Sequence, residues 1–457
     1  MASTYISRTT GTPTDNQKCT VSFWWKNSEA KPSGGSDRVI FGTETTAASY
    51  IYLRNTGEIS VWQASTGTFD FRTTRLAADP SAWYHICYTI DTTLADSTAR
   101  VKVYVNGVRE TAFNASSAMA QDSAVRWNEA SKVVYIGGGF NQNMNGLLSH
   151  FHFIDGTAYD ASTFGETDST SGIWKIKTGP SVTYGDNGFF LKFEDSSNMD
   201  LDSSPNAHTF TTSGNLTATK DNPSNNFCTW NPLAVDAGET YVFENGNTVC
   251  LMASASGWSG TSGTLAAAGG KWYMEGYINY TPAAYNTTCG WTSTKLVNQK
   301  GAYGQIGYGD KGSLATGYGV SIGVYDTGTL LYSTDAAKEQ STGSWATAWA
   351  AGDYLMFAID IDGGKFYFGA NGTWDSGASN DPAAGTGGAS FVPGGLFYTP
   401  ITTVYQERLE MNFGNGYFST TVAGTNADAN GEGAFKYTPP SGFYAMCTNN
   451  LKLYGAA

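Results

Sequence analysis

The chain has 457 residues, a length that corresponds to two or three domains, and we take two as the working number. Aromatic and charged residues each make up 14% of it, with 55 glycines against 13 prolines, which excludes a coiled coil and a disordered chain and favours a compact, turn-rich protein. The formal net charge of -13 would repel phosphate backbones and anionic lipids, which argues against nucleic acid and membrane surfaces as partners.

The N-terminal residues 1–8 lack the apolar core of a signal peptide, and apolar runs long enough to cross a membrane are missing. We therefore expect a protein made in the cytoplasm without insertion into a membrane. The six cysteines lie far apart in the sequence, which predicts buried free thiols rather than a disulfide framework or a metal site.

Alternation of apolar and polar residues with a period of two predicts strands throughout the first half. The clearest example is Val101-Lys102-Val103-Tyr104-Val105, which runs into Asn106-Gly107, a pair that tolerates the positive φ of a tight hairpin turn. Further strands are expected at 19–26, 38–42, 49–54, 59–63, 83–91, 132–136, 146–154 and 188–194.

The second half repeats this design, and a strand again ends in Asn-Gly at 365–372. Only 157–164 and 336–339 carry a helical signal, each enough for a single turn, so the sequence predicts an all-β chain. The other strands expected here are 240–243, 270–279, 319–325, 354–360, 396–405 and 408–413.

A run of turn-forming residues, centred on Lys220 to Asn226, separates the two halves. It predicts one domain at 1–220, a linker at 221–236 and a second domain at 237–457. Apart from the shared strand that ends in Asn-Gly, the sequences of the two halves do not superpose, so they do not indicate a recent duplication.

Three segments of the first half resemble, in order and spacing, the concanavalin A-like jelly roll of laminin-G and pentraxin domains: 19–26, 83–89 and 103–107. His85-Ile86-Cys87-Tyr88-Thr89 matches most of the pentraxin His-x-Cys-x-Thr-Trp signature, with Ile90 in place of its tryptophan. Ser22 falls where the partner cysteine of the pentraxin disulfide would stand. The segments 188–195, 202–208 and 223–233 resemble the tail of this jelly roll in large virion proteins of tailed bacteriophages.

The second half resembles a SPRY domain in four motifs that occur in the family's order. These are the Gly-x-x-Tyr-x-Glu strand at 270–276, the Gly-Asp strand at 352–360, the Asn-Gly hairpin at 365–372 and the Asn-Phe-Gly strand at 408–414. The closing segment 439–447 is typical of phage versions. The resemblances imply two concanavalin A-like antiparallel β-sandwiches, or jelly rolls, in tandem.

A glycanase of this fold needs carboxylates that face one another across the sugar. Glu166 and Asp168 lack a third carboxylate, and Asp360 and Asp362 lead directly into two glycines, so both pairs are interpreted as turn caps. The sequence also lacks a Gly-x-Ser-x-Gly elbow and a phosphate-binding loop. We therefore expect a protein that is not an enzyme.

Two groups of residues raise the question of a metal. His150 and His152 lie two apart on a strand, but ordinary alternation, with phenylalanine inward and histidine outward, explains them without a third ligand. Asp195, Asp200 and Asp202 offer hard oxygen ligands for calcium, and the alternative is a solvated acidic turn. Beyond that calcium candidate, the sequence predicts no cofactor.

Ligand contact in a sandwich falls to the end loops, where tryptophan can stack on sugar rings. The candidates lie in or beside Gly/Ser/Thr-rich segments of the second half, and a core position is the alternative for each. The first choice is the loop with Asn371, Trp374 and Asp375, because its tryptophan follows a tight hairpin. The remaining candidates are Trp258, Trp291, Trp345 and Trp349.

The phage resemblance and the aromatic loops together predict a non-catalytic virion fibre, spike or surface appendage that binds host-surface glycans. Its partners would be other virion proteins, those glycans and further copies of itself, with a trimer as the first candidate, because linked copies raise avidity. One alternative is a purely structural capsid decoration or tail subunit. A polysaccharide depolymerase is the other.

Overall fold

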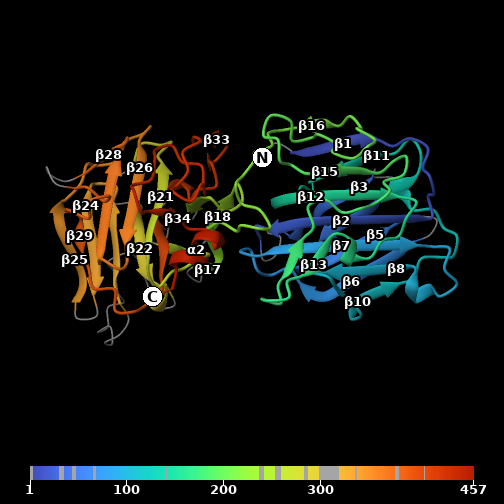
Figure 1. The fold of residues 1–457 in the computed structure, drawn as a ribbon, viewed down its shortest axis with the longest axis horizontal. Coiled ribbons are helices and arrows are strands. Elements are labelled where there is room, and N and C mark those ends of the chain that lie inside the picture. The colour runs from blue at the N-terminus through green and yellow to red at the C-terminus, as the bar shows by residue number, and fades with distance from the viewer. Residues whose placement is uncertain are drawn as a thin grey trace. The chain divides into compact units, whose positions relative to one another are not determined.

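The computed structural model describes residues 4–29, 35–43, 48–64, 68–139, 142–235, 241–252, 259–282, 287–297, 319–334, 337–375, 380–405 and 407–456. Strands make up 45% of the structure and helices 5%, and the strands pair almost entirely antiparallel, which confirms the predicted all-β class (Figure 1). The chain divides into two compact units, Met1–Ala218, drawn from blue to green, and Thr219–Ala457, drawn from yellow-green to red.

Unit 1 contains two main sheets and a small hairpin. The eight-stranded sheet has the order β10 (Phe113–Ser117), β6 (Phe69–Leu76), β5 (Glu58–Gln63), β4 (Ser49–Leu53), β3 (Arg38–Thr43), β11 (Val133–Ile136), β1 (Tyr5–Thr9) and β16 (Thr211–Ser213). The six-stranded sheet has the order β15 (Phe189–Leu191), β12 (Gly146–Asp155), β2 (Lys18–Asn27), β7 (Trp83–Asp91), β8 (Val101–Val105) and β9 (Val108–Arg109). Strands β13 (Gly165–Thr167) and β14 (Trp174–Ile176) form the hairpin.

The core of unit 1 lies between these two sheets and is rich in aromatic rings. Phe23 of β2 stacks on Phe151 of β12 at 5.2 Å between ring centroids, and Phe41 of β3 reaches across to Phe151 at 5.4 Å. The predicted Val-Tyr-Val strand and its turn are confirmed: the valines of β8 are buried, and Asn106 and Gly107 have φ of 48° and 76°.

A second layer covers the other face of the six-stranded sheet. Its buried cluster joins Cys87 of β7, Ile154 of β12 and Phe190 of β15 to Phe164 and Tyr184, which lie in the segment 157–188. The predicted single helical turn in that segment is a 3-10 turn, η5 (Ala161–Thr163). Both faces of this sheet are therefore buried.

Unit 2 also contains two large sheets. The first has the order β17 (Trp230–Val235), β20 (Ser259–Gly263), β30 (Tyr398–Val404), β22 (Thr287–Ser293), β23 (Ser321–Tyr325), β24 (Thr329–Thr334) and β25 (Ala337–Ser344). The second has the order β18 (Tyr241–Glu244), β19 (Val249–Met252), β31 (Arg408–Asn412), β21 (Lys271–Tyr277), β26 (Tyr354–Asp360), β27 (Lys365–Ala370) and β28 (Thr373–Trp374), with β29 (Ala389–Ser390) on β27 and β34 (Tyr444–Ala445) on β21. A short pair, β32 (Tyr417–Phe418) and β33 (Thr421–Val422), follows β31.

The second sheet of unit 2 is also buried on both faces. Trp272, Met274 and Phe357 point into the main core, whereas Tyr273 and Tyr367 pack under Phe435 and Phe443 of the C-terminal segment. Glu275 of β21 holds that segment against the sheet through hydrogen bonds. Its carboxylate accepts hydrogen bonds from the backbone N–H groups of Lys436 and Tyr437, each at 2.8 Å.

Several local expectations differ from the structure. Residues 221–236, predicted as a linker, belong to unit 2 and supply β17 with the buried Trp230. Residues 337–344 form β25 instead of a helical turn, and the helix α2 (Thr448–Tyr454) was not predicted. Across the described residues, α2 and α1 (Thr294–Val297) are the α-helices, and neither is long and apolar enough to cross a membrane.

Candidate functional site

The outer face of the eight-stranded sheet carries an aromatic and charged surface. In β4 and β5, Ile51, Leu53 and Val61 point into the core, so the alternating residues Tyr50, Tyr52 and Trp62 lie on the opposite face. The same alternation in β6 buries Phe69 and Phe71 and places Asp70 and Arg72 outside. We call Tyr50, Tyr52, Trp62, Asp70 and Arg72 the sheet-face site.

Strand register sets these side chains in two parallel rows. Tyr50 is opposite Trp62, which is opposite Asp70, while Tyr52 is opposite Ser60, which is opposite Arg72. The Tyr50 and Trp62 rings stack at 5.7 Å with an interplanar angle of 23°, and both are half-buried. Gly42 makes room for this stack, since a Cβ there would lie 2.6 Å from Cδ1 of Tyr50.

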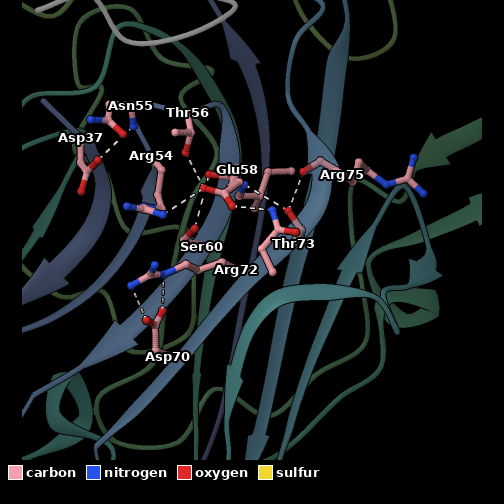
Figure 2. A network of polar contacts seen from close by, with 12 residues as sticks. Asp37, Arg54, Asn55, Thr56, Glu58, Ser60, Asp70, Arg72, Thr73 and Arg75 are labelled. Atoms are coloured by element: carbon pink, nitrogen blue, oxygen red, sulfur yellow. Dashed lines mark hydrogen bonds and ion pairs between the residues drawn. The ribbon is translucent and has the colours of Figure 1, made fainter. Parts of the chain in front are cut away.

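The charged groups beside the rings are held in ion pairs (Figure 2). Arg72 donates from Nε to Oδ1 of Asp70 at 3.1 Å, and its Nη2 lies 2.6 Å from Oδ2, which makes a two-pronged pair. Where β4 connects to β5, Arg54 pairs with Glu58 at 3.1 Å. Ser60 lies between the two pairs in this view.

Burial governs the ionisation of the site. It raises the pKa of Tyr52 to about 12, with the Asp70 and Asp37 carboxylates acting in the same direction, so the phenol stays protonated at neutral pH. The hydrogen bond to Asp70 raises the pKa of Arg72. The site therefore offers ring faces for stacking, together with protonated donors and paired carboxylates that can bond hydroxyl groups.

The tryptophans predicted in unit 2 are distributed differently. Trp291 in β22 is 0% exposed and Trp349 is 5% exposed, so both belong to the core, which corrects the expectation that they contact a ligand. Trp345 is half-buried and stacks on Phe366 at 6.1 Å. Trp258 lies outside the described residues.

The favoured loop uses its polar groups to hold its own shape. Asn371 accepts a hydrogen bond from the Tyr354 backbone N–H at 3.0 Å and donates to Asp353 at 2.7 Å. Asp375 accepts from the backbone N–H and the hydroxyl of Thr347, each at 2.9 Å.

Trp374 is half-buried and meets the ring of Tyr273 edge-on at 6.3 Å. Asn371, Trp374 and Asp375, the three predicted contact residues of this loop, therefore contact other residues of unit 2. They do not stand side by side with stacked rings and ion pairs, as the sheet-face residues do.

The calcium candidates do not converge. Asp202 is buried, and its carboxylate accepts from the backbone N–H groups of Phe190, Ser204 and His208. Asp195 bonds Ser197, and Asp200 bonds the hydroxyl of Thr212. In the part of the chain that the structure describes, no group of three or more His, Cys, Asp or Glu side chains could hold a metal.

His85, His150 and His152 lie beneath the second layer rather than in solvent, which corrects the outward placement of His150 and His152. His152 is stacked on Phe190 at 3.8 Å between centroids and bonds the Tyr184 hydroxyl at 3.0 Å. The expectation failed because the covering segment comes from elsewhere in the sequence.

Ser22 and His85 form a pair that resembles part of a nucleophilic site. Trp174 donates its indole N–H to Nδ1 of His85 at 3.0 Å, while Nε2 lies 2.9 Å from the Ser22 hydroxyl. Neutral His85 therefore carries its proton on Nε2 and donates to Ser22, the reverse of what a general base requires. Burial also lowers the pKa of His85 to about 3.

The sequence did contain a signal for the sheet-face site. Tyr50, Tyr52 and Trp62 occupy the phase of their strands that is normally polar when one face is buried. The glycine-rich segments of unit 2 predicted exposed tryptophans, whereas Trp291 and Trp349 are buried.

Comparisons with known proteins agree with the fold of unit 1. Residues 1–162 match the family model described as the concanavalin A-like lectin/glucanases superfamily, and this unit has that fold. A search of curated proteins finds no match.

Similar solved structures match part of the chain. A pentraxin from Limulus polyphemus is 17% identical, with 41% of this chain and 88% of that chain covered and a TM-score of 0.28. A carbohydrate-binding protein described as putative, from Bacteroides ovatus, is 17% identical, with coverages of 47% and 58% and a TM-score of 0.30. The SPRY domain of human HERC1 is 14% identical, with coverages of 40% and 96% and a TM-score of 0.26.

Proposed function

We propose that the protein binds carbohydrate through the sheet-face site of unit 1 and acts as a non-catalytic attachment protein. The observation that carries this proposal is the stacked Tyr50–Trp62 pair beside the two-pronged Asp70–Arg72 pair. Apolar C–H faces of a sugar stack on aromatic rings, while its hydroxyl groups bond planar charged groups. The family that residues 1–162 match is described by its lectins and glucanases, which supports the same ligand class.

The chemistry of the charged groups favours binding over hydrolysis. Glycoside hydrolysis needs one carboxylic acid and one carboxylate free to act on the sugar. Asp70 and Glu58 are instead neutralised by Arg72 and Arg54, and hydrogen bonds from Thr56 and Asn114 lower the pKa of Glu58 in spite of its burial. Glu58 is therefore poorly suited to donate a proton at neutral pH.

In its biological setting, we propose that the protein is a virion fibre, spike or surface appendage that attaches to host glycans as a homo-oligomer. The resemblance of 188–195 and 439–447 to phage virion proteins supports this setting. Repeated copies would turn weak contacts at one site into strong attachment. The purely structural role, in which the sandwiches contact only other virion proteins, remains the second candidate.

The test is a glycan array and calorimetry on the whole chain and two matched variants. Trp62→Ala removes one ring of the sheet-face stack, and Trp374→Ala removes a half-buried ring of unit 2. We expect Trp62→Ala to weaken binding about tenfold, the equivalent of about 1.4 kcal/mol, and Trp374→Ala to change it less than twofold. Thermal unfolding would establish that both variants fold.

The rival roles give different results in the same experiment. Loss of binding in Trp374→Ala alone would move the site to unit 2. Failure of the wild-type chain to bind any glycan would favour the structural role. Release of new reducing ends from a bound polysaccharide would identify a depolymerase.

A further inference from the structure

We propose that the sheet-face site selects neutral glycans and rejects those that carry carboxylate or sulfate groups. This inference rests on the proposed function and specifies its ligand class. It follows from how the charges on this face of the sheet are paired.

Each of the three arginines of β4 to β6 and their connections is already engaged by a carboxylate. Arg54 pairs with Glu58 at 3.1 Å, Arg72 with Asp70 at 2.6 Å, and Arg75 with Glu110 at 2.6 Å. An acidic sugar would have to displace one of these carboxylates to reach a guanidinium group. It would exchange one ion pair for another and leave the displaced carboxylate uncompensated beside it.

The remaining charge near the rings is negative. Asp37, which accepts a hydrogen bond from the backbone N–H of Asn55, adds its carboxylate to the field around Tyr52. Among the described charged groups around Tyr52, the two arginine pairs cancel, so Asp37 leaves an excess of negative charge. The net charge of -13 on the whole chain acts in the same direction at long range.

A neutral sugar meets no such penalty. Trp62 and Asp70 are direct cross-strand neighbours, so their backbones lie about 5 Å apart and their side chains share one face of the sheet. A ring stacked on Trp62 can direct hydroxyl groups at the Asp70–Arg72 pair, whose oxygens accept and whose guanidinium donates. The protonated Tyr52 hydroxyl supplies another donor or acceptor in the adjacent row.

The experiment compares neutral polysaccharides with carboxymethylated and sulfated derivatives of the same polymers, using the full chain. We expect binding to the neutral polymers that is weakened about tenfold in Trp62→Ala. In the wild-type chain this binding should change less than twofold between 50 mM and 500 mM NaCl, values chosen to span about a threefold change in the screening length. Binding to the acidic derivatives should be at least tenfold weaker.

Asp70→Asn provides the gain-of-function arm, because it releases Arg72 from its partner. We expect this variant to bind the carboxymethylated polymer at least fivefold better than the wild-type chain, with an affinity that falls as salt is added. The double variant Asp70→Asn/Arg72→Gln should lose that gain while unfolding at a similar temperature, which separates charge from misfolding.

The outcomes distinguish this inference from the proposed function. Binding of acidic derivatives by the wild-type chain as strongly as the neutral polymers, in a Trp62-dependent manner, would overturn the inference and leave the sheet-face site in place. An Asp70→Asn variant with no gain toward the acidic polymer would also overturn it. Absence of Trp62-dependent binding to every polymer would overturn both.

Discussion

Acid should destabilise unit 1 because three of its four histidines, His85, His150 and His152, are buried in the neutral form. Burial lowers the pKa of His85 to about 3, against about 6.5 in an unfolded chain. Below pH 6.5 the unfolded state therefore binds more protons than the folded state, and the free energy of unfolding falls as the pH drops. At pH 5 the loss from His85 alone is about 2 kcal/mol.

Two further buried histidines of unit 1, His152 and His150, contribute in the same direction as His85. Burial lowers the pKa of His152, and the nearby His150, His85 and Lys192 lower it further, so its loss has the same sign. Burial also lowers the pKa of His150, although the Glu194 carboxylate acts to raise it. A typical domain is stable by about 5–15 kcal/mol, so these losses are a large fraction of the total.

Unit 2 should respond in the opposite direction, because all four histidines precede residue 219 and its most buried acid is Glu275. Burial raises the pKa of Glu275 to about 7, although hydrogen bonds from Tyr437 and Lys436 oppose the shift. Between pH 7 and its unfolded value near 4.5, the folded state holds the proton that the unfolded state has lost. The free energy of unfolding of unit 2 should therefore rise by about 2 kcal/mol between pH 8 and pH 5.

Urea titration followed by a short protease pulse, with fragments assigned to each unit by mass spectrometry, would measure both effects. For domains of this size, about 2 kcal/mol corresponds to a midpoint shift of about 1 M urea. We expect the midpoint of unit 1 to fall and that of unit 2 to rise between pH 8 and pH 5. In His85→Gln, which stays neutral, the fall should shrink by about 1 M. Midpoints that move in parallel, or a His85→Gln variant with the full fall, would refute the reasoning.

Three further substitutions test single features of the structure by the same unfolding assay. Glu275→Gln should cost unit 2 about 2–3 kcal/mol at pH 8, because an amide N–H would face the donors of Lys436, Tyr437, Tyr273 and Asn412. Glu166→Gln on the exposed β13 strand should cost less than about 0.5 kcal/mol, and equal costs would contradict the role of Glu275 in holding the C-terminal segment. Gly107→Ala should cost unit 1 about 2–3 kcal/mol and expose Trp174 to a fluorescence quencher, because the new Cβ would lie 2.4 Å from the indole ring. The control Gly172→Ala has a similar φ of 71° but no atom within 4 Å of its Cβ, so it should cost only about 1 kcal/mol. Asp202→Asn should lower the stability of unit 1 by about 1–3 kcal/mol, whereas the exposed Asp195→Asn should have a clearly smaller effect. Millimolar calcium should leave the wild-type midpoint unchanged, and a calcium-dependent rise would restore these aspartates as ligands.

Local chemistry explains how much of the fold could be predicted. The period-two pattern of Val101 to Val105 and the Asn106-Gly107 turn depend on residues that are neighbours in sequence, so the hairpin was predicted correctly. The failures lie where a distant segment decides the outcome. The linker prediction failed because turn formers at 220–226 do not reveal that Trp230 is buried in unit 2.

The same distinction applies to the candidate site. The amino-acid pattern by itself determined that Tyr50, Tyr52 and Trp62 share one face of two strands, because side chains alternate along a strand. Only the tertiary structure decided which sheet faces stay uncovered: segment 157–190 buries His85 and His152, and the C-terminal segment buries Tyr273 and Tyr367. Alternation assigns a residue to a face, but the exposure of that face depends on packing by residues far away in the sequence, and such packing leaves no local pattern.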